Sequence, residues 1–190
     1  MGTRGAMGVR INGHDHVTYN HYDSYPEGLG ADIVDVLQHN PINKLKNLAN
    51  YLIPVKEDQE PTVYEIEALR NYLDLTVGQQ KETDWYCLLR GTQGDFLKFL
   101  NAQYYIDSYD FLKDSLFCEF AYIVNFDDNV FEVYQGFQKT RHTYGRYANL
   151  SRETYAKEVD DYYPVALVAT FPLDNIPEDW IKIAFPQEED

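Results

Sequence analysis

RGAMGVRINGHDHVTYNHY, residues 4–22, decides the fold because it has the pattern of a β-hairpin. The dipeptide Asn12-Gly13 is a strong signal for a tight hairpin turn, since both residues tolerate the positive φ that such a turn requires. We therefore predict one strand over residues 4–11 and a return strand over residues 16–22. On this prediction the chain starts with two paired antiparallel strands.

Helical patterns fill the middle of the chain. Ile33, Val34 and Leu37 have the spacing of one helix face, which predicts a helix from about Gly30. Pro41 interrupts this pattern, and further amphipathic stretches follow it. Helices are predicted over residues 42–53, over 63–73 and over most of 83–116, with breaks at Gly91 and Gly94.

Strand patterns return towards the C-terminal end. The segments CEFAYIVNF (118–126) and VFEVYQGF (130–137) flank a tight turn at residues 127–129, which predicts a second hairpin. A polar loop is expected over 138–161, another strand over 164–173, and a short helix or strand over 177–185.

Strands at both ends of a chain with helices between them predict an α+β fold. We expect an antiparallel sheet from the N- and C-terminal strands, packed against a helical layer formed by roughly residues 30–116. A chain of 190 residues fits a single domain over residues 1–190, with an acidic C-terminal tail at 186–190.

The composition is that of a folded protein. Hydrophobic residues make up 44% of the chain and aromatic residues 15%, including 17 Tyr, which argues against intrinsic disorder. Cys87 and Cys118 lie in apolar stretches, and the His14-Asp15-His16 pattern is expected to face solvent, so we expect no metal site and no cofactor. No apolar run is long enough to span a membrane and no signal peptide is visible, so we expect a cytoplasmic protein without membrane contact.

The formal net charge of −15 is unevenly distributed. Residues 1–50 are almost neutral, and the rest of the chain is acidic. Direct nucleic-acid binding is not expected, because clustered Lys and Arg side chains are missing. The acidity favours either simple solubility or an acidic face that engages a basic partner. Arg141 and Arg146 are expected to pair with the protein's own carboxylates.

The segment YNHYDSYPEGLG, residues 19–30, follows the first hairpin and is the candidate functional segment. One interpretation is architectural. Pro26 fixes a backbone angle, the glycines permit a sharp bend, and Asp23 or Ser24 bonds the backbone of the turn.

A second interpretation is a ligand pocket at the start of the following helix, where free amides attract anions. Arg4 would supply a bidentate donor, His21 and Asp23 would bracket the ligand, and tyrosines would stack on it. The candidate ligand-binding residues are Thr3, Arg4, Asn20, His21, Asp23, Ser24, Tyr25, Gly28 and Gly30.

A third interpretation is a hydrolase centred on the N-terminal hairpin. Thr3 lies near the start of the first strand, as in enzymes whose N-terminal residue is the nucleophile, but removal of Met1 exposes Gly2 rather than Thr3. His21 with Ser24 or Asp23 is the alternative catalytic pair.

The same region resembles a family of small, largely uncharacterised proteins from phages, prophages and bacteria. The family pattern begins Met-x-Thr-Arg and continues to a His-Trp-Asp-Gly-Tyr-Pro-x-x-x-Gly block. The chain departs from it at Tyr22, where the family has Trp, and at Ser24, where it has Gly. The resemblance covers about the first 35 residues and, loosely, the later hairpin. The matching residues are Thr3, Arg4, His21, Asp23, Tyr25, Pro26 and Gly30.

The resemblance implies a phage or mobile-element accessory protein. We expect it to act by binding, in an inhibitory or anti-defence interaction with a host protein that has a basic surface, or with a small nucleotide-like ligand. The alternative is the hydrolase described above. The oligomeric state stays open.

Overall fold

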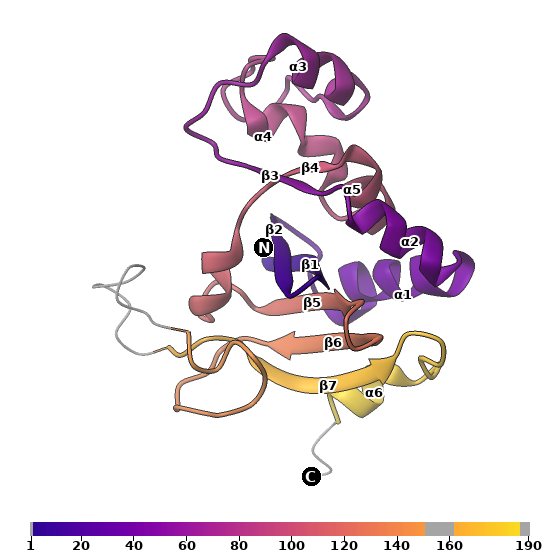
Figure 1. Ribbon diagram of the computed structural model, residues 1–190. Coiled ribbons are helices and arrows are strands. Elements are labelled where there is room, and N and C mark those ends of the chain that lie inside the picture. Colours follow the sequence, from indigo (N-terminus) through magenta and orange to yellow (C-terminus); the bar gives the residue numbers. More distant parts are fainter. Residues whose placement is uncertain (1, 151–161, 187–190) are drawn as a thin grey trace.

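The computed structural model describes residues 2–150 and 162–186, and its main feature is a five-stranded sheet (Figure 1). The strands are β1 (Gly5–Ile11), β2 (His14–Asn20), β5 (Phe120–Asn125), β6 (Val130–Gln135) and β7 (Ala166–Pro172). They are arranged in the order β2-β1-β5-β6-β7. Neighbouring strands are antiparallel except β1 and β5, which are parallel. The predicted α+β fold, with a mostly antiparallel sheet of N- and C-terminal strands, is confirmed.

The first hairpin forms at the predicted turn, but β2 spans His14–Asn20 rather than the predicted residues 16–22. Asn12 and Gly13 connect β1 to β2 with φ values of 52° and 77°, the positive values that a tight hairpin turn requires. The carboxylate of Asp127, in the turn between β5 and β6, accepts hydrogen bonds of 2.8 Å from the backbone N–H groups of both residues. The turns of the two hairpins are therefore joined at one end of the sheet.

The helices are short and most lie between β2 and β5 in the sequence. Thr62 and Glu65 form a reciprocal capping box at the start of α3, and Asp95 caps α5. The helices are α1 (Ala31–His39), α2 (Ile42–Ala49), α3 (Val63–Leu69), α4 (Trp85–Leu88), α5 (Phe96–Ala102) and α6 (Trp180–Ala184). Shorter helical turns are η1 (Pro26–Gly30), η2 (Arg70–Tyr72), η3 (Arg90–Thr92) and η4 (Tyr109–Lys113).

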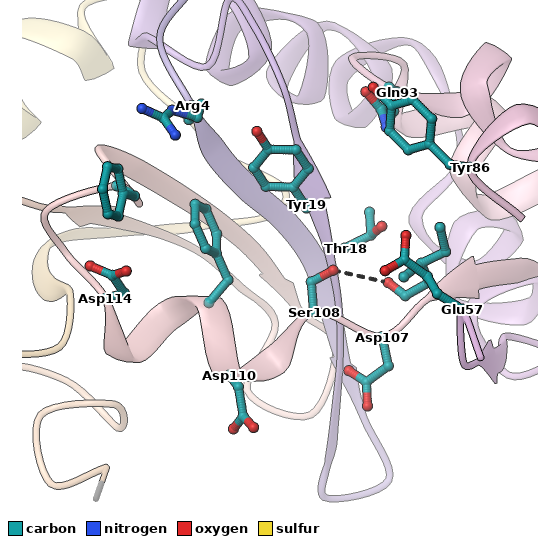
Figure 2. Close-up of a pocket in the computed structure, with 13 residues that line it drawn as sticks. Arg4, Thr18, Tyr19, Glu57, Tyr86, Gln93, Asp107, Ser108, Asp110 and Asp114 are labelled. Atoms are coloured by element: carbon teal, nitrogen blue, oxygen red, sulfur yellow. Dashed lines mark hydrogen bonds between the residues drawn. The ribbon is translucent and has the colours of Figure 1, made fainter. Parts of the chain in front are cut away.

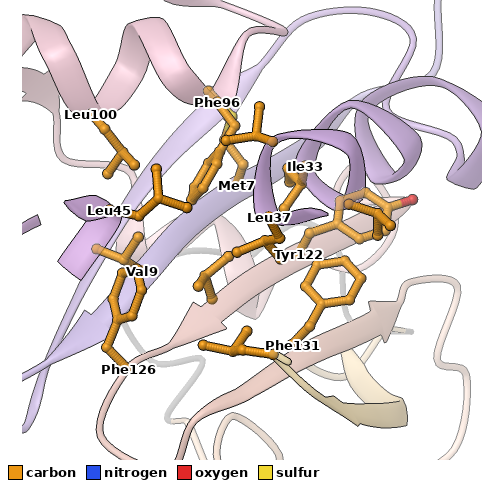
Figure 3. Close-up of a cluster of buried hydrophobic side chains, with 14 of the residues drawn as sticks. Met7, Val9, Ile33, Leu37, Leu45, Phe96, Leu100, Tyr122, Phe126 and Phe131 are labelled. Carbon is orange, nitrogen blue, oxygen red and sulfur yellow. The ribbon is translucent and has the colours of Figure 1, made fainter. Parts of the chain in front are cut away.

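One face of the sheet packs against α1, α2, α5 and α6 (Figure 3). Met7 and Val9 of β1 point to this face, because alternate residues of a strand share one side of the sheet. This is the main hydrophobic core, and it confirms that helices from the middle of the chain cover the sheet. Its members include Ile33, Leu37, Leu45, Phe96, Leu100, Tyr122, Phe126 and Phe131.

The opposite face of the sheet is covered by η4, by residues 147–150 and by Val165, which precedes β7. Arg146 anchors part of this cover, because its guanidinium group bonds the carboxylates of Asp15 and Glu132. The expectation that Arg146 pairs with the protein's own carboxylates is thus confirmed. The hydrophobic residues of this second core include Ala6, Val17, Leu112, Ala121, Ile123, Tyr134, Tyr147 and Val165.

A second, two-stranded sheet was not predicted. β3 (Ile53–Val55) and β4 (Tyr104–Ile106) pair in parallel, so the expected helix over 42–53 ends at Ala49 and the expected helical region over 83–116 is interrupted. Pro54 is poorly suited to continue a helix, and Tyr104–Ile106 is a short aromatic and β-branched run. A helical pattern in one segment gives no sign of a pairing partner about fifty residues away. A third hydrophobic cluster packs against this small sheet, with Leu69, Trp85, Leu88 and Leu89 among its members.

Candidate functional site

The segment after β2 forms a turn that is bonded into the fold. Ser24 is fully buried, and its backbone N–H donates to the carbonyl of Thr3 at 3.1 Å. The Ser24 carbonyl accepts a hydrogen bond of 2.9 Å from the Tyr122 hydroxyl, and the Ser24 hydroxyl accepts one of 2.8 Å from the Asn20 side-chain amide. Thr3, Asn20 and Ser24 therefore come together as parts of one turn.

The two glycines of this turn lie in positions that exclude a larger side chain. A Cβ atom on Gly28 would approach the Asp23 carbonyl oxygen to 2.3 Å. A Cβ atom on Gly30 would lie 2.7 Å from the Trp180 ring and 3.0 Å from the Tyr122 ring. Close packing therefore accounts for both glycines without a ligand.

Three of the predicted binding residues in the segment face outwards. His21, Asp23 and Tyr25 are exposed, and the His21 ring bonds the Tyr19 hydroxyl at 2.9 Å. Within the described residues, no contact joins His21 to the buried Ser24 hydroxyl. The binding role predicted for His21, Asp23 and Tyr25 stays a prediction, and the structure places them on the surface of the turn.

A cavity of about 600 Å³ lies beside the outer strand β2 (Figure 2). Thr18 and Tyr19 of β2 line it, and the chain from Ile106 to Phe117 forms much of the opposite wall. Of the residues predicted to bind a ligand, Arg4 alone is among those that line this cavity. The lining also contains four carboxylates, so we call it the acidic cavity: Glu57, Asp107, Asp110 and Asp114.

Four aromatic rings also line the acidic cavity. Tyr19 and Phe111 contact each other edge to face, with ring centres 5.1 Å apart. Tyr86 and Phe117 are the other two rings. The guanidinium group of Arg4 stacks over the ring of Phe117. Burial raises the pKa of the Tyr19 hydroxyl above its usual value, although the positive charge of Arg4 opposes the rise.

A polar atom without a partner also lies on the lining. The side-chain oxygen of Gln93 is buried and has no hydrogen-bond partner among the described residues. Buried acceptors are normally bonded, so this oxygen is an unmet acceptor on a residue of the cavity wall. The charges of the lining favour a cationic donor, because the described residues that line the cavity include four carboxylates and one cation, Arg4. Lys113, which is not among the lining residues, pairs with the Asp110 carboxylate.

A second, smaller cavity adjoins the first and shares Gln93 with it. It has a volume of about 510 Å³, and Tyr22, one of the two positions at which the chain departs from the family pattern, lines it. The Arg90 guanidinium lies 5.0 Å from the centre of the Tyr22 ring, and the buried Arg90 Nε has no partner among the described residues. The segment after β2 thus borders this cavity through Tyr22 rather than through His21 or Asp23.

A larger cavity, of about 930 Å³, lies between η1 and α6. Phe120, Ile181 and Phe185 give it an apolar wall. Pro186, the last residue that the structure describes before residues 187–190, also lines it.

The sequence contains a signal for the acidic cavity that the prediction did not use. Asp107, Asp110, Phe111, Asp114 and Phe117 recur at intervals of three or four residues, so carboxylates and rings gather on one side of the chain. Glu57 and Gln93 come from distant segments, and no local pattern connects them with this run. The cavity is produced by the fold rather than by one motif.

Comparison with protein family models, with curated proteins and with solved structures finds no match to this chain. The resemblance to the phage and bacterial family therefore stays a prediction. In the part of the chain that the structure describes, no helix is long and apolar enough to cross a membrane. No three His, Cys, Asp or Glu side chains within residues 2–150 and 162–186 are grouped so that they could hold a metal ion.

Proposed function

We propose that the protein acts by binding, and that the acidic cavity receives a positively charged side chain, lysine or arginine, of a partner protein. The observation that carries this proposal is the lining itself, in which four carboxylates and four aromatic rings surround about 600 Å³. Carboxylates attract a cation, and aromatic rings bind both the cation and the apolar stem that carries it.

The lining favours a basic partner over the nucleotide-like ligand that the sequence also allowed. A phosphate group in the acidic cavity would face the carboxylates of Asp107, Asp110 and Asp114, and among the described lining residues Arg4 alone would offer it a positive charge. The net charge of −15 adds a long-range attraction for a basic surface. The carboxylates of the cavity and the net charge of the protein both attract cations and repel phosphate, so we favour a basic protein partner.

The biological setting is part of the same proposal. The resemblance of the first 35 residues or so supports a phage or mobile-element accessory protein that works in the host cytoplasm. An acidic protein that covers a basic surface on a host protein would block whatever that surface binds, which fits an inhibitory role.

The test uses two small molecules that differ in the charge of the side chain. N-acetyl-lysine methylamide (the lysine probe) carries an ammonium group, and N-acetyl-norleucine methylamide (the norleucine probe) has an uncharged linear side chain. The proposal expects calorimetric titration to show that the lysine probe binds more tightly than the norleucine probe, and that added salt weakens its binding. Equal affinity for the two probes would contradict the proposal.

A pair of charge-matched variants locates the effect. Glu57 and Asp110 are exposed carboxylates of the acidic cavity, so the double variant Glu57→Gln/Asp110→Asn should bind the lysine probe at least about tenfold more weakly. The control Asp174→Asn/Glu178→Gln removes the same two charges from exposed positions outside the cavity and should retain the affinity. Equal losses in both variants would assign the binding to net charge alone.

A further inference from the structure

The outer edge of the main sheet borders the acidic cavity. β2 is the last strand on its side of the sheet, and its residues Thr18 and Tyr19 line the cavity. An outer strand has one side on which backbone N–H and C=O groups lack a neighbouring strand. The backbone partners along this edge therefore decide what the cavity can bind.

The hydrogen-bond ladder shows which way the Tyr19 backbone points. The Val17 carbonyl accepts a bond of 2.8 Å from the backbone N–H of Ser108, which lies outside the sheet. Val17 therefore turns its backbone groups away from β1, and in an antiparallel ladder the residue two positions on does the same. Tyr19 is that residue, and it is paired in register with Ala6.

The hydrogen bonds between β1 and β5 also indicate that the Tyr19 backbone groups point away from β1. The carbonyl groups of Arg4 and Arg10 accept bonds from Glu119 and Phe126, so even-numbered β1 residues such as Ala6 bond towards β5. Ala6 therefore does not bond the backbone N–H and C=O groups of Tyr19. Among the described residues, the Tyr19 hydroxyl bonds the His21 ring, and no bond to the Tyr19 backbone groups is found.

The lining of the acidic cavity thus contains both backbone groups and a side-chain oxygen that lack hydrogen-bond partners in the described part of the chain. The Tyr19 N–H and C=O groups face away from the sheet, and the buried Gln93 oxygen lacks a donor. Charged carboxylates lie around them on the same lining. A free amine would satisfy the carboxylates only, whereas an extended peptide would offer both backbone groups and a charged side chain.

We infer that the cavity binds an extended segment of the partner protein, which adds to the edge of β2 opposite Tyr19 and directs a lysine or arginine side chain at the carboxylates. This inference rests on the proposed function and specifies the form of the partner. Backbone pairing supplies affinity in this mode of recognition, and the side-chain pocket supplies selectivity. The occupant is a basic segment because a second copy of this chain would bring another net charge of −15 to the same surface.

The experiment compares the lysine probe with the peptide acetyl-Thr-Val-Lys-Val-Thr-amide. Two further peptides carry an N-methyl group, one on the backbone nitrogen of Lys and the other on that of the next Val. Successive amides of an extended chain point to opposite sides, so one methyl group should block pairing with Tyr19 and the other should not. A norleucine version of the peptide controls for the charge.

We expect the unmethylated peptide to bind at least about tenfold more tightly than the lysine probe. One methylated peptide should bind about tenfold more weakly than the unmethylated peptide, and the other should retain most of the affinity of the unmethylated peptide. The norleucine peptide should bind more weakly than its lysine counterpart, and the ¹⁵N-labelled amide of Tyr19 should shift with the peptide.

The alternatives give different results. If both methylated peptides bind as tightly as the unmethylated one, the cavity takes the side chain without backbone pairing, and the inference fails while the proposed function stands. If neither the lysine probe nor any peptide binds, the proposed function fails as well. If the protein sediments as a dimer that the peptide dissociates, a second copy occupies the edge, and the inference is overturned.

Discussion

The guanidinium group of Arg4 lies 4.7 Å from the centre of the Phe117 ring, on the wall of the acidic cavity. The backbone N–H of Arg4 also donates to the Glu119 carboxylate at 3.1 Å. These contacts hold a positive charge beside the cavity carboxylates. Arg4 therefore competes electrostatically with an incoming cation, and its removal separates our proposal from an anion-binding one.

Replacement of Arg4 by Ala should strengthen binding of the lysine probe. Loss of one like charge near the surface corresponds to roughly 0.5–1 kcal/mol, or about two- to fivefold in affinity. Calorimetric titration of Arg4→Ala measures the change, and Lys44→Ala, an exposed cation on α2, is the control that should leave affinity nearly unchanged. Weaker binding by Arg4→Ala would instead support Arg4 as a ligand donor.

Replacement of Gly30 by Ala should destabilise the protein. The added Cβ would lie 2.7 Å from the Trp180 ring and 3.0 Å from the Tyr122 ring, in a packed core, and overpacking of this kind costs about 1–3 kcal/mol. Urea unfolding measures the loss. His21→Ala, an exposed change in the same segment, should stay within about 0.5 kcal/mol of wild type. A neutral Gly30→Ala would show that the turn is looser than the contacts indicate.

Replacement of Arg146 by Met should be strongly destabilising. Arg146 is bonded to both Asp15 and Glu132, and the Glu132 residue is only 5% exposed, so the variant leaves the buried Glu132 carboxylate without its cation, while Asp15 keeps its ion pair with Arg10. Breaking one side of a buried ion pair costs about 3–5 kcal/mol.

The matched control for Arg146→Met is Arg70→Met, which breaks an exposed pair with Glu67. An exposed pair contributes about 0–1 kcal/mol, so this variant should unfold almost like wild type in urea. Similar losses in the two variants would mean that the buried network adds little to stability.

The turn carboxylate Asp127 should make stability depend on pH. The backbone N–H group of Gly13, then that of Asn12, and the charge of Arg10 hold the Asp127 pKa below its usual value of 3.8. A carboxyl group with a lowered folded pKa contributes stability above 3.8, and this contribution is lost as pH falls through the folded pKa.

The variant Asp127→Asn should therefore be less stable than wild type at about pH 7, and the gap should narrow in acid below the usual pKa. Urea unfolding of both proteins across this range gives the difference in free energy of unfolding. A difference that stays constant with pH would show that the charge of Asp127 does not contribute.

Local patterns predicted much of the sheet. The Asn12-Gly13 turn and the alternation of Met7 and Val9 specify the first hairpin from a few neighbouring residues. The parallel pairing of β1 with β5 joins residues more than a hundred positions apart, and no local pattern encodes it. The same reason explains why the pairing of β3 with β4 was missed.

The candidate site was predictable only in part. The aromatic turn after β2 is distinctive in the sequence, and its glycines and Ser24 have structural reasons to be there. Its role in binding stays a prediction. Its placement beside a cavity depends on Arg90 and Gln93, which approach from the middle of the chain. The acidic cavity needs Glu57 and Asp107, from distant segments of the chain, to lie beside β2, and that placement is set by tertiary packing.

The central claim is that the acidic cavity binds a cationic side chain, and the most direct test is titration of ¹⁵N-labelled protein with the lysine and norleucine probes. We predict that the lysine probe shifts the amides of Gln93, Ser108 and Phe111 along saturable curves, while the norleucine probe shifts them much less. Shifts centred elsewhere, or equal shifts with both probes, would contradict the claim.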